Sequence, residues 1–164
     1  MKNLFSYTVL GLLAASLLAS CFLKSYKPEN MPLKRLEFGQ GGGVTGAVKE
    51  YTLLPNGQVF VKNTLDNYYL ELKRVKPREF KSAWHKLDSL RFLKYDFYHP
   101  GNVYAFLRLS DEEVEQEIAW DPYGYWQPEE GFLKVYNQLM QTVQNLPVQD
   151  TLFLMPDSTT TATQ

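Results

Sequence analysis

Residues 47–62 read AVKEYTLLPNGQVFVK, and this stretch decides the fold class. Residues 47–54 are rich in β-branched and aromatic side chains, and residues 58–62 (QVFVK) share that character. Between them, Pro55-Asn56-Gly57 is a strong turn signal, since asparagine and glycine adopt the backbone angles that a tight hairpin needs. The stretch therefore predicts an antiparallel β-hairpin.

Further strands are expected on both sides of this hairpin. Residues 68–73 (YYLELK) alternate in polarity, with Tyr68, Leu70 and Leu72 on one face. The same alternation marks residues 34–38, 102–109 and 114–121.

Two segments have the helical period instead. The first begins at Pro77, a residue that the first turn of a helix tolerates, and the second begins at Pro128. The apolar stripe of the first consists of Phe80, Ala83, Trp84 and Leu87, and that of the second consists of Phe132, Tyr136, Leu139, Met140 and Val143. Strands followed by helices predict an α+β fold, an antiparallel β-meander with two amphipathic helices packed on one face. We expect a single domain at residues 33–147.

The composition limits the class of protein. The chain has 164 residues, 45% of them hydrophobic, so it is long enough for one core and too apolar for a disordered chain. Its formal charge of −1 argues against nucleic acid as a partner, since phosphate binding needs a basic surface. The one cysteine, Cys21, excludes an intrachain disulfide.

Residues 1–20 have the form of a secretory signal peptide, with Lys2 ahead of an apolar run at residues 9–18. Leu18-Ala19-Ser20-Cys21 then resembles a bacterial lipobox. That resemblance implies cleavage before Cys21 and attachment of lipid to its sulfur and its new amino group. Phe22 follows where an acidic residue often marks inner-membrane retention, which favours an outer-membrane lipoprotein and leaves the membrane face open.

Two other interpretations of the leader stay open. Residues 4–23 are long enough, at about 1.5 Å of rise per residue, to cross a bilayer as an uncleaved anchor. Alternatively, Cys21 is an ordinary buried thiol. In the lipoprotein interpretation, residues 21–32 are the lipid-bearing cysteine and a polar, proline-containing tether.

The C-terminal extension covers residues 148–164. Its apolar part, residues 151–155 (TLFLM), either adds an edge strand or packs on the core. Residues 157–164 (DSTTTATQ) are polar and threonine-rich, and they are predicted to be disordered.

Residues 40–46 (QGGGVTG) are the first candidate site. The residues expected to meet a partner here are Gly41, Gly42, Gly43, Thr45 and Gly46. They match the G-x-G-x-x-G pattern of dinucleotide-binding loops, but that site needs a helix next and a strand follows. The kinase motifs H-R-D and D-F-G do not occur in the sequence, so no cofactor is expected. The segment is either a tight turn that needs positive φ angles or a backbone-lined surface that binds a partner.

Residues 120–126 (WDPYGYW) are the second candidate site, since tyrosine and tryptophan are common at interface hot spots. The partner-binding candidates here are Tyr123, Tyr125 and Trp126. Another aromatic loop contains Tyr95, Phe97 and Tyr98. Such rings either bind a partner or a sugar, or they cap the open end of the core.

The sequence marks no catalytic or metal site. His85 and His99 stand apart from ligand-spaced residues, and we expect structural or surface roles for both. Ser82 lies near His85 on the predicted helix, but the G-x-S-x-G motif of a nucleophile elbow does not occur in the sequence. Paired carboxylates of a glycoside hydrolase stay open, because they need only proximity in space. The acidic segment lacks the glycine-bearing loop of an EF-type calcium site, and it contains Asp111, Glu112, Glu113, Glu115 and Glu117.

The motif F-G-x-G-G-G-x-T-G-x-V, followed by a tyrosine strand and an N-G turn, resembles a group of small bacterial envelope lipoproteins without an assigned function. Its residues here are Phe38, Gly39, Gly41, Gly42, Gly43, Thr45, Gly46, Val48, Tyr51, Asn56 and Gly57. The resemblance covers about residues 33–146. More distantly, the order of elements and three glycines (Gly42, Gly43 and Gly46) are similar to emfourin-like protein inhibitors of metallopeptidases. No inhibitory residue of that family can be transferred to this chain.

Together these patterns predict a lipoprotein of the cell envelope, held at the membrane through Cys21, that binds another envelope protein and is not an enzyme. One alternative is an inhibitor of a secreted peptidase. The other is a small glycan-binding or hydrolytic module, which would need a cleft that joins carboxylates to Trp126 or Tyr123.

Overall fold

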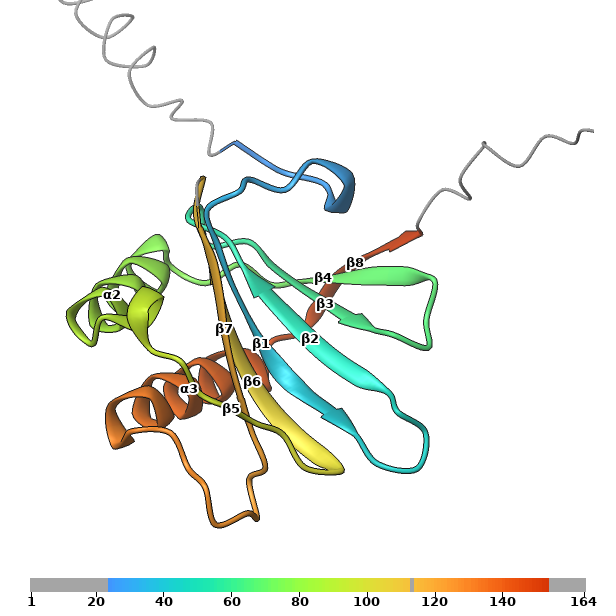
Figure 1. Cartoon of the computed structure of the whole chain (residues 1–164). Helices are drawn as coiled ribbons and strands as arrows, with labels where there is room; N and C mark the ends of the chain where they lie inside the picture. The colour runs from blue at the N-terminus through green and yellow to red at the C-terminus, as the bar shows by residue number, and fades with distance from the viewer. Residues whose placement is uncertain (1–23, 113, 154–164) are drawn as a thin grey trace, which may run out of the picture.

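The computed structural model describes residues 24–112 and 114–153, which form one eight-stranded sheet with two α-helices on one face (Figure 1). The strands are β1 (Arg35–Gly42), β2 (Val48–Leu53), β3 (Val59–Asn63), β4 (Tyr68–Leu72), β5 (Tyr98–His99), β6 (Val103–Ser110), β7 (Glu115–Trp120) and β8 (Val148–Phe153). The helices are α2 (Pro77–Ser89) and α3 (Glu130–Val143), with short 3-10 turns η1 (Pro28–Asn30) and η2 (Phe92–Lys94). The predicted α+β fold is confirmed.

Strand β1 lies in the middle of the sheet, whose order is β5-β7-β6-β1-β2-β3-β4-β8. Phe38 of β1 lies opposite Tyr51 of β2 on one side and opposite Leu107 of β6 on the other. The meander β1 to β4 is followed by α2, after which the chain returns to the other side of β1. All neighbouring strands are antiparallel except β5 and β7, which pair in parallel at Tyr98 and His99.

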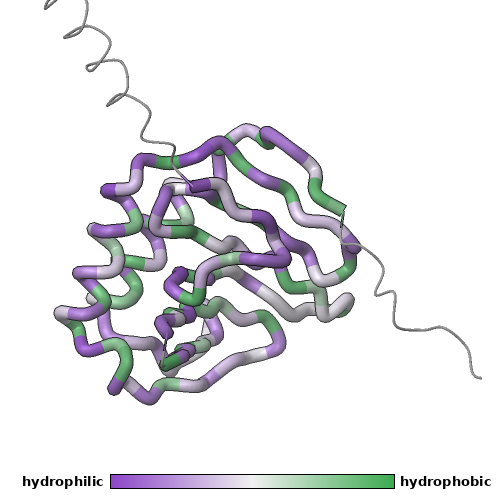
Figure 2. The backbone as a smooth tube through the Cα atoms, turned by 90° about the horizontal axis from the view of Figure 1, so that it is seen from above, coloured by the Kyte–Doolittle hydropathy of each residue, from purple (hydrophilic) through white to green (hydrophobic). Residues whose placement is uncertain are grey.

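The core lies between the helices and the sheet. Leu36, Phe38 and Leu107 contribute from the central strands, and all three are fully buried. The predicted helix stripes supply the other side, where the buried residues include Phe80, Ala83, Leu87, Phe132, Tyr136, Leu139, Met140 and Val143. Figure 2 shows the alternation of hydrophobic and hydrophilic residues along the helices. Burying one large apolar side chain contributes ~1.5–3 kcal/mol, so this layer is the main source of stability.

The segment before β1 packs on the sheet, although its polar sequence is typical of a free tether. Gln58 is fully buried, and its side-chain amide makes two hydrogen bonds to the backbone of Tyr26. The amide oxygen accepts from the N–H of Tyr26 at 2.7 Å, and the amide nitrogen donates to the carbonyl oxygen of Tyr26 at 3.1 Å. The side-chain amide of Asn56 donates to the carbonyl oxygen of Lys24. The backbone of the segment thus provides hydrogen-bond partners for the buried side-chain amide of Gln58. Without such partners, burial of this amide would destabilise the fold.

The edge-strand alternative for the C-terminal extension is confirmed, and one further strand, β5, lies where the sequence pattern marked none. β8 pairs with β4, so residues 148–153 of the predicted extension belong to the sheet, and residues 151–153 form an edge strand. The side chains of β8 are mostly exposed, so its pairing depends on backbone hydrogen bonds. The two-residue β5 lies in the aromatic connection before β6. The predicted signal peptide, Cys21 and the threonine-rich tail lie outside the described residues.

Candidate functional site

All the candidate partner-binding residues except Gly41 and Gly42 lie in loops at one end of the sheet, in the lower part of Figure 1. The loops are the β1–β2 turn (residues 43–47), the β5–β6 turn (residues 100–102) and the β7–α3 connection (residues 121–129). The N–H of Gly43 donates to the carbonyl oxygen of Asn102 at 2.7 Å, and that of Asp121 donates to the carbonyl oxygen of His99 at 3.0 Å. These bonds join the three loops into one surface, which we call the loop end.

Gly41 and Gly42 lie in β1 and not in a loop, in contrast to the prediction, because β1 continues beyond its expected end at Phe38. A Cβ added at Gly41 would lie 2.7 Å from the hydroxyl oxygen of Tyr104, and one added at Gly42 would clash with the carbonyl oxygen of Asn102. These two glycines therefore allow neighbouring groups to approach the strand closely.

The exposed part of the glycine segment is the turn at Gly43, Val44, Thr45 and Gly46. Gly43 and Gly46 have φ angles of 75° and 63°, a region that glycine enters without steric cost. The N–H of Gly46 donates to the carbonyl oxygen of Gly43 at 3.2 Å, which closes the turn. Val44 is fully exposed at the tip. Among the described residues, a Cβ built at Gly43 or Gly46 meets open space.

The β7–α3 connection presents three large aromatic rings to solvent. Tyr123 and Tyr125 are each 89% exposed, and Trp126 is 62% exposed. The backbone beneath them is nevertheless fixed, because the carboxylate of Asp121 accepts the N–H of Tyr123 at 2.8 Å. The side-chain amide of Gln127 also donates to the carbonyl oxygen of Asp121 at 2.8 Å. A fixed loop with exposed rings loses little conformational entropy when it binds a partner.

His99 extends this aromatic surface onto β5. Trp126 stacks on His99 with ring centroids 5.7 Å apart, and Tyr125 meets Trp126 edge-on at 5.2 Å. Phe97 packs against the other side of the network, 4.9 Å from His99, and Tyr98 is 63% exposed. The two aromatic loops that the sequence indicated are therefore continuous at the loop end.

Trp120, at the start of the same aromatic segment, caps the core instead. It is buried and meets Tyr136 edge-on with centroids 4.9 Å apart. The hydroxyl of Tyr136 donates to the carbonyl oxygen of Gly39 at 3.1 Å. Burial raises the pKa of Tyr136 to about 12, so the hydroxyl keeps its proton at neutral pH. The segment therefore places one ring, Trp120, in the core and leaves three rings in solvent.

A small pocket beside the aromatic loop lacks the chemistry of a glycoside hydrolase. Its volume is about 240 Å³, and it is lined by Gln40, Ala105, Trp120, Pro122, Gln127, Leu133, Tyr136 and Asn137. None of these residues is acidic, whereas glycoside hydrolysis needs two carboxyl groups. Neither Tyr123 nor Trp126 lines this pocket, so it does not join those rings to carboxylates.

A cluster of charged side chains lies on the sheet face away from the helices. Arg108 donates to Glu117 at 2.8 Å and lies 3.3 Å from Glu37 and 3.6 Å from Glu50. Burial raises the pKa of Glu50, and the charge of Glu37 adds to the shift. Burial alone would lower the pKa of Arg108, but the hydrogen bond and the charge of Glu117 raise it above its ordinary value. The arrangement is an ion-pair network centred on Arg108.

Within residues 24–112 and 114–153, no group of three or more His, Cys, Asp or Glu is placed to hold a metal ion. The predicted acidic segment lies on and beside the β6–β7 turn, where Asp111 pairs with Lys34 at 3.4 Å. Glu113 falls outside the described residues. No helix in the described part of the chain is long and apolar enough to span a bilayer.

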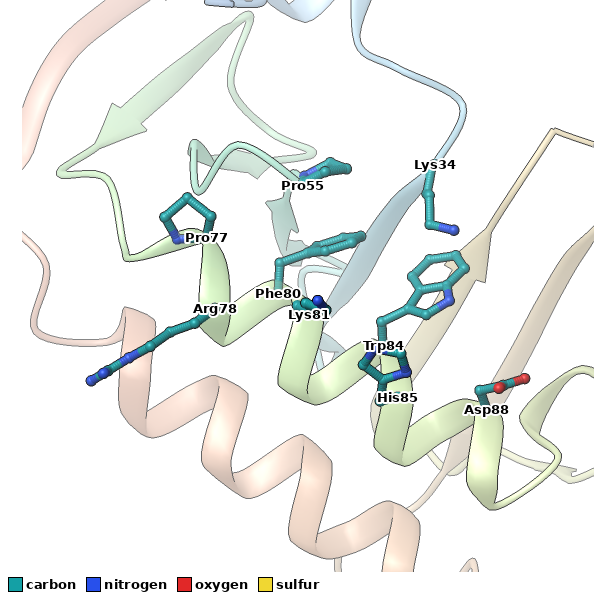
Figure 3. A pocket seen from close by; sticks show the side chains of 9 residues that line it. All are labelled: Lys34, Pro55, Pro77, Arg78, Phe80, Lys81, Trp84, His85 and Asp88. Atoms are coloured by element: carbon teal, nitrogen blue, oxygen red, sulfur yellow. The ribbon is translucent and has the colours of Figure 1, made fainter. Parts of the chain in front are cut away.

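A larger pocket on α2 escaped the sequence analysis (Figure 3). It has a volume of about 580 Å³ and is lined by Lys34, Pro55, Pro77, Arg78, Phe80, Lys81, Trp84, His85 and Asp88. Trp84 was the available signal, because this large ring lies at the margin of the apolar stripe between Lys81 and His85. It stays half-buried, unlike the rest of the stripe. Lys34 and Pro55 also line the pocket and lie outside α2, so the sequence of the helix alone could not predict it.

Neither the models of known protein families nor the curated proteins match this sequence. The resemblance of its glycine segment to small envelope lipoproteins and to emfourin-like inhibitors therefore stays a prediction.

Proposed function

We propose that this protein is a lipid-anchored lipoprotein of the bacterial envelope whose loop end binds another envelope protein. The observation that carries the proposal is the exposure of Tyr123, Tyr125 and Trp126 on a hydrogen-bonded loop. Exposed aromatic patches are typical of interaction sites, and tyrosine and tryptophan are enriched among hot-spot residues. The turn at Val44 adds an apolar tip to the same surface.

The orientation of the domain follows from the proposed anchor. The described chain begins at Lys24, which is held by Asn56 at the end of the sheet opposite the loop end (Figure 1). Lipid on Cys21 would keep that end near the membrane, and two or more acyl chains make such anchoring stable. The loop end would then face away from the membrane, where a partner can reach it. Phe22 favours the outer membrane.

Affinity capture tests the binding role. Residues 22–164 contain the whole described fold, whose core lies between Leu36 and Val143, and they would be immobilised against an envelope extract of the source cell. The matched samples are the Tyr125→Ala/Trp126→Ala double variant and Phe153→Ala, which removes a ring that is 68% exposed on β8. We expect one envelope protein at near-stoichiometric amount on the unmodified domain and on Phe153→Ala, and its loss on the loop variant.

Other outcomes separate the alternatives. Equal retention by the loop variant would contradict binding through the loop end. A retained peptidase that loses activity in proportion to added domain would select the inhibitor alternative. An empty column would contradict protein binding and favour a glycan or another small ligand.

Mass spectrometry of the membrane-extracted protein tests the anchor separately. We expect an acylated N-terminal peptide that begins at Cys21, and we expect Cys21→Ser to prevent both cleavage and acylation. An unmodified Cys21 thiol, or a chain that still carries residues 1–20, would contradict the lipoprotein assignment.

A further inference from the structure

The pocket on α2 has an apolar floor. Phe80 and Trp84 stack there with ring centroids 5.4 Å apart, and Pro55 and Pro77 flank them (Figure 3). Phe80 is buried against the core, whereas Trp84 keeps one side toward solvent. The accessible apolar surface of the floor therefore comes mainly from Trp84, Pro55 and Pro77, with Phe80 packed beneath them.

The rim of the pocket is cationic. Lys34, Arg78 and Lys81 line it together with His85, and Asp88 is the one acidic residue among the lining side chains. Arg78 also pairs with Glu79, next to it on α2, at 3.2 Å. The Lys34 ammonium lies 4.0 Å from the centroid of the Trp84 ring. An ammonium on an aromatic face keeps its charge, so the cation lies where the apolar floor meets the polar rim.

We propose that this pocket binds one anionic phospholipid, with the phosphate on the cationic rim and the first part of the acyl chains on Phe80 and Trp84. A volume of about 580 Å³ lies in the ordinary range of small-ligand sites, roughly 300–1,000 Å³. The charges on the rim match the head group, and the stacked rings match the hydrocarbon that follows it.

The acidic β6–β7 turn favours a single bound lipid over general attraction to an anionic membrane. Asp111 lies 3.4 Å from Lys34, and Glu112 is exposed on the same turn. A flat anionic membrane would contact these carboxylates as well as the cations of the rim, so repulsion would offset attraction. A lipid drawn into the pocket meets Lys81 and Arg78 on α2, of which Arg78 also pairs with Glu79 at 3.2 Å.

The position of the pocket makes a lipid available. Pro55 of the pocket is next to Asn56, which holds Lys24, and Cys21 is three residues earlier in the sequence. Three extended residues reach about 10 Å, so a lipid on Cys21 would keep the pocket near the membrane. The proposal rests on the proposed anchor for the supply of lipid, but the binding itself does not require the anchor.

The test titrates residues 22–164 with dihexanoyl phosphatidylglycerol below its micelle concentration, observed through the backbone amide resonances of α2. We expect saturable binding with shifts centred on residues 78–88. Dihexanoyl phosphatidylcholine should bind roughly tenfold more weakly, because its head group lacks the net negative charge. Glycerol phosphate, which lacks the chains, should also bind at least roughly tenfold more weakly, because it leaves the floor empty.

A pair of charge variants locates the site. Arg78→Glu with Lys81→Glu should weaken phosphatidylglycerol binding by roughly tenfold or more, since each cation near a lipid phosphate contributes several-fold. Lys49→Glu with Lys134→Glu is the matched control, because it makes the same change in net charge at exposed residues that do not line this pocket. The control should bind within about twofold of the unmodified domain. All four positions are exposed, and circular dichroism would verify the fold.

Three results would overturn the proposal. They are equal binding of phosphatidylcholine, binding of glycerol phosphate as tight as that of the lipid, and equal losses in the pocket variant and its control. The second result would assign the pocket to a free phosphate compound. None of them affects the capture experiment at the loop end, so the two proposals can fail independently.

Discussion

The glycine segment and the aromatic loop lie at the same end of the sheet, yet they use their candidate residues in opposite ways. Gly41 and Gly42 are packed within β1, where a side chain would meet Tyr104 or the neighbouring backbone. Tyr123 and Tyr125 extend into solvent from a loop that hydrogen bonds hold in place. Residues with the same predicted role therefore divide into those that build the end of the sheet and those that can contact a partner.

The difference teaches how to interpret such segments. From the sequence, a glycine indicates only that a side chain is absent. Whether a neighbouring strand or solvent occupies that space depends on tertiary contacts. A cluster of aromatic residues indicates a large apolar area. In this loop, hydrogen bonds to the backbone hold a conformation in which that area is exposed.

The largest expected effect on binding lies in the aromatic loop. Replacing Tyr125 and Trp126 together by alanine should raise the Kd for the captured partner by at least roughly 30-fold, because hot-spot rings contribute about 2 kcal/mol or more. The melting temperature should change by less than about 2 °C, since exposed side chains contribute little to stability. Isothermal titration and a thermal melt give the two values. A large fall in melting temperature with unchanged affinity would reverse the division of roles.

Gly42→Ala should have the largest effect on stability. The new Cβ would clash with the carbonyl oxygen of Asn102 at a φ angle of 95°, so we expect a loss of about 3 kcal/mol in the free energy of unfolding. Urea denaturation measures this loss. Full stability in the variant would show that Gly42 does not need to pack closely against the β5–β6 turn.

Gly43→Ala is the matched substitution one residue later. Its Cβ would meet open space among the described residues, so only the positive φ angle opposes it and the expected cost is about 1 kcal/mol. The same urea experiment compares it with Gly42→Ala. Equal costs at the two positions would remove the distinction between the strand part and the turn part of the glycine segment.

The smallest effect concerns Glu50, which lies opposite Gly39 across the β1–β2 pair. Burial raises its pKa in the folded state, so the ionised carboxylate destabilises the fold when the pH is above that pKa. The penalty fades as the pH falls through the folded-state value, and it is absent below the unfolded value near 4.5. Glu50→Gln should therefore stabilise the protein near neutral pH by less than about 1 kcal/mol, because it also removes a partner of Arg108.

Melts of this variant across the pH range measure the difference. The stabilisation should shrink as the pH is lowered toward the unfolded-state value. A difference that grows on acidification would mean that the carboxylate supports the fold, and that the strand part of the glycine segment depends on its charge.

Much of the fold could be predicted because local periodicity reports burial. The hairpin at residues 47–62 appears as β2 and β3, and the stripe through Phe80 and Leu87 faces the core. The pairing of β1 with β6 could not be predicted, since several partners share the same alternation. β5 left no signal, and the apolar residues 151–155 indicated β8 only as one of two alternatives, because short or exposed strands held by backbone bonds need no apolar pattern.

The candidate site was predictable to a smaller extent. The aromatic residues could be chosen from composition, but the packing of Gly41 depends on Tyr104, which is distant in the sequence. The α2 pocket likewise needs Lys34 and Pro55 beside Trp84. Such arrangements depend on tertiary contacts, and no sequence window contains all their parts.

The central place of β1 has a consequence for how the chain reaches its native state. β1 is the first strand to be synthesised, but Phe38 finds its partner Leu107 only after most of the chain has been made. Until then β1 keeps a bare edge, and such edges pair readily with other chains. Long-range pairing of this kind also slows folding. A ribosome-bound chain should therefore need a chaperone to keep it from aggregating, and truncation before β6 would leave an aggregation-prone half-sheet.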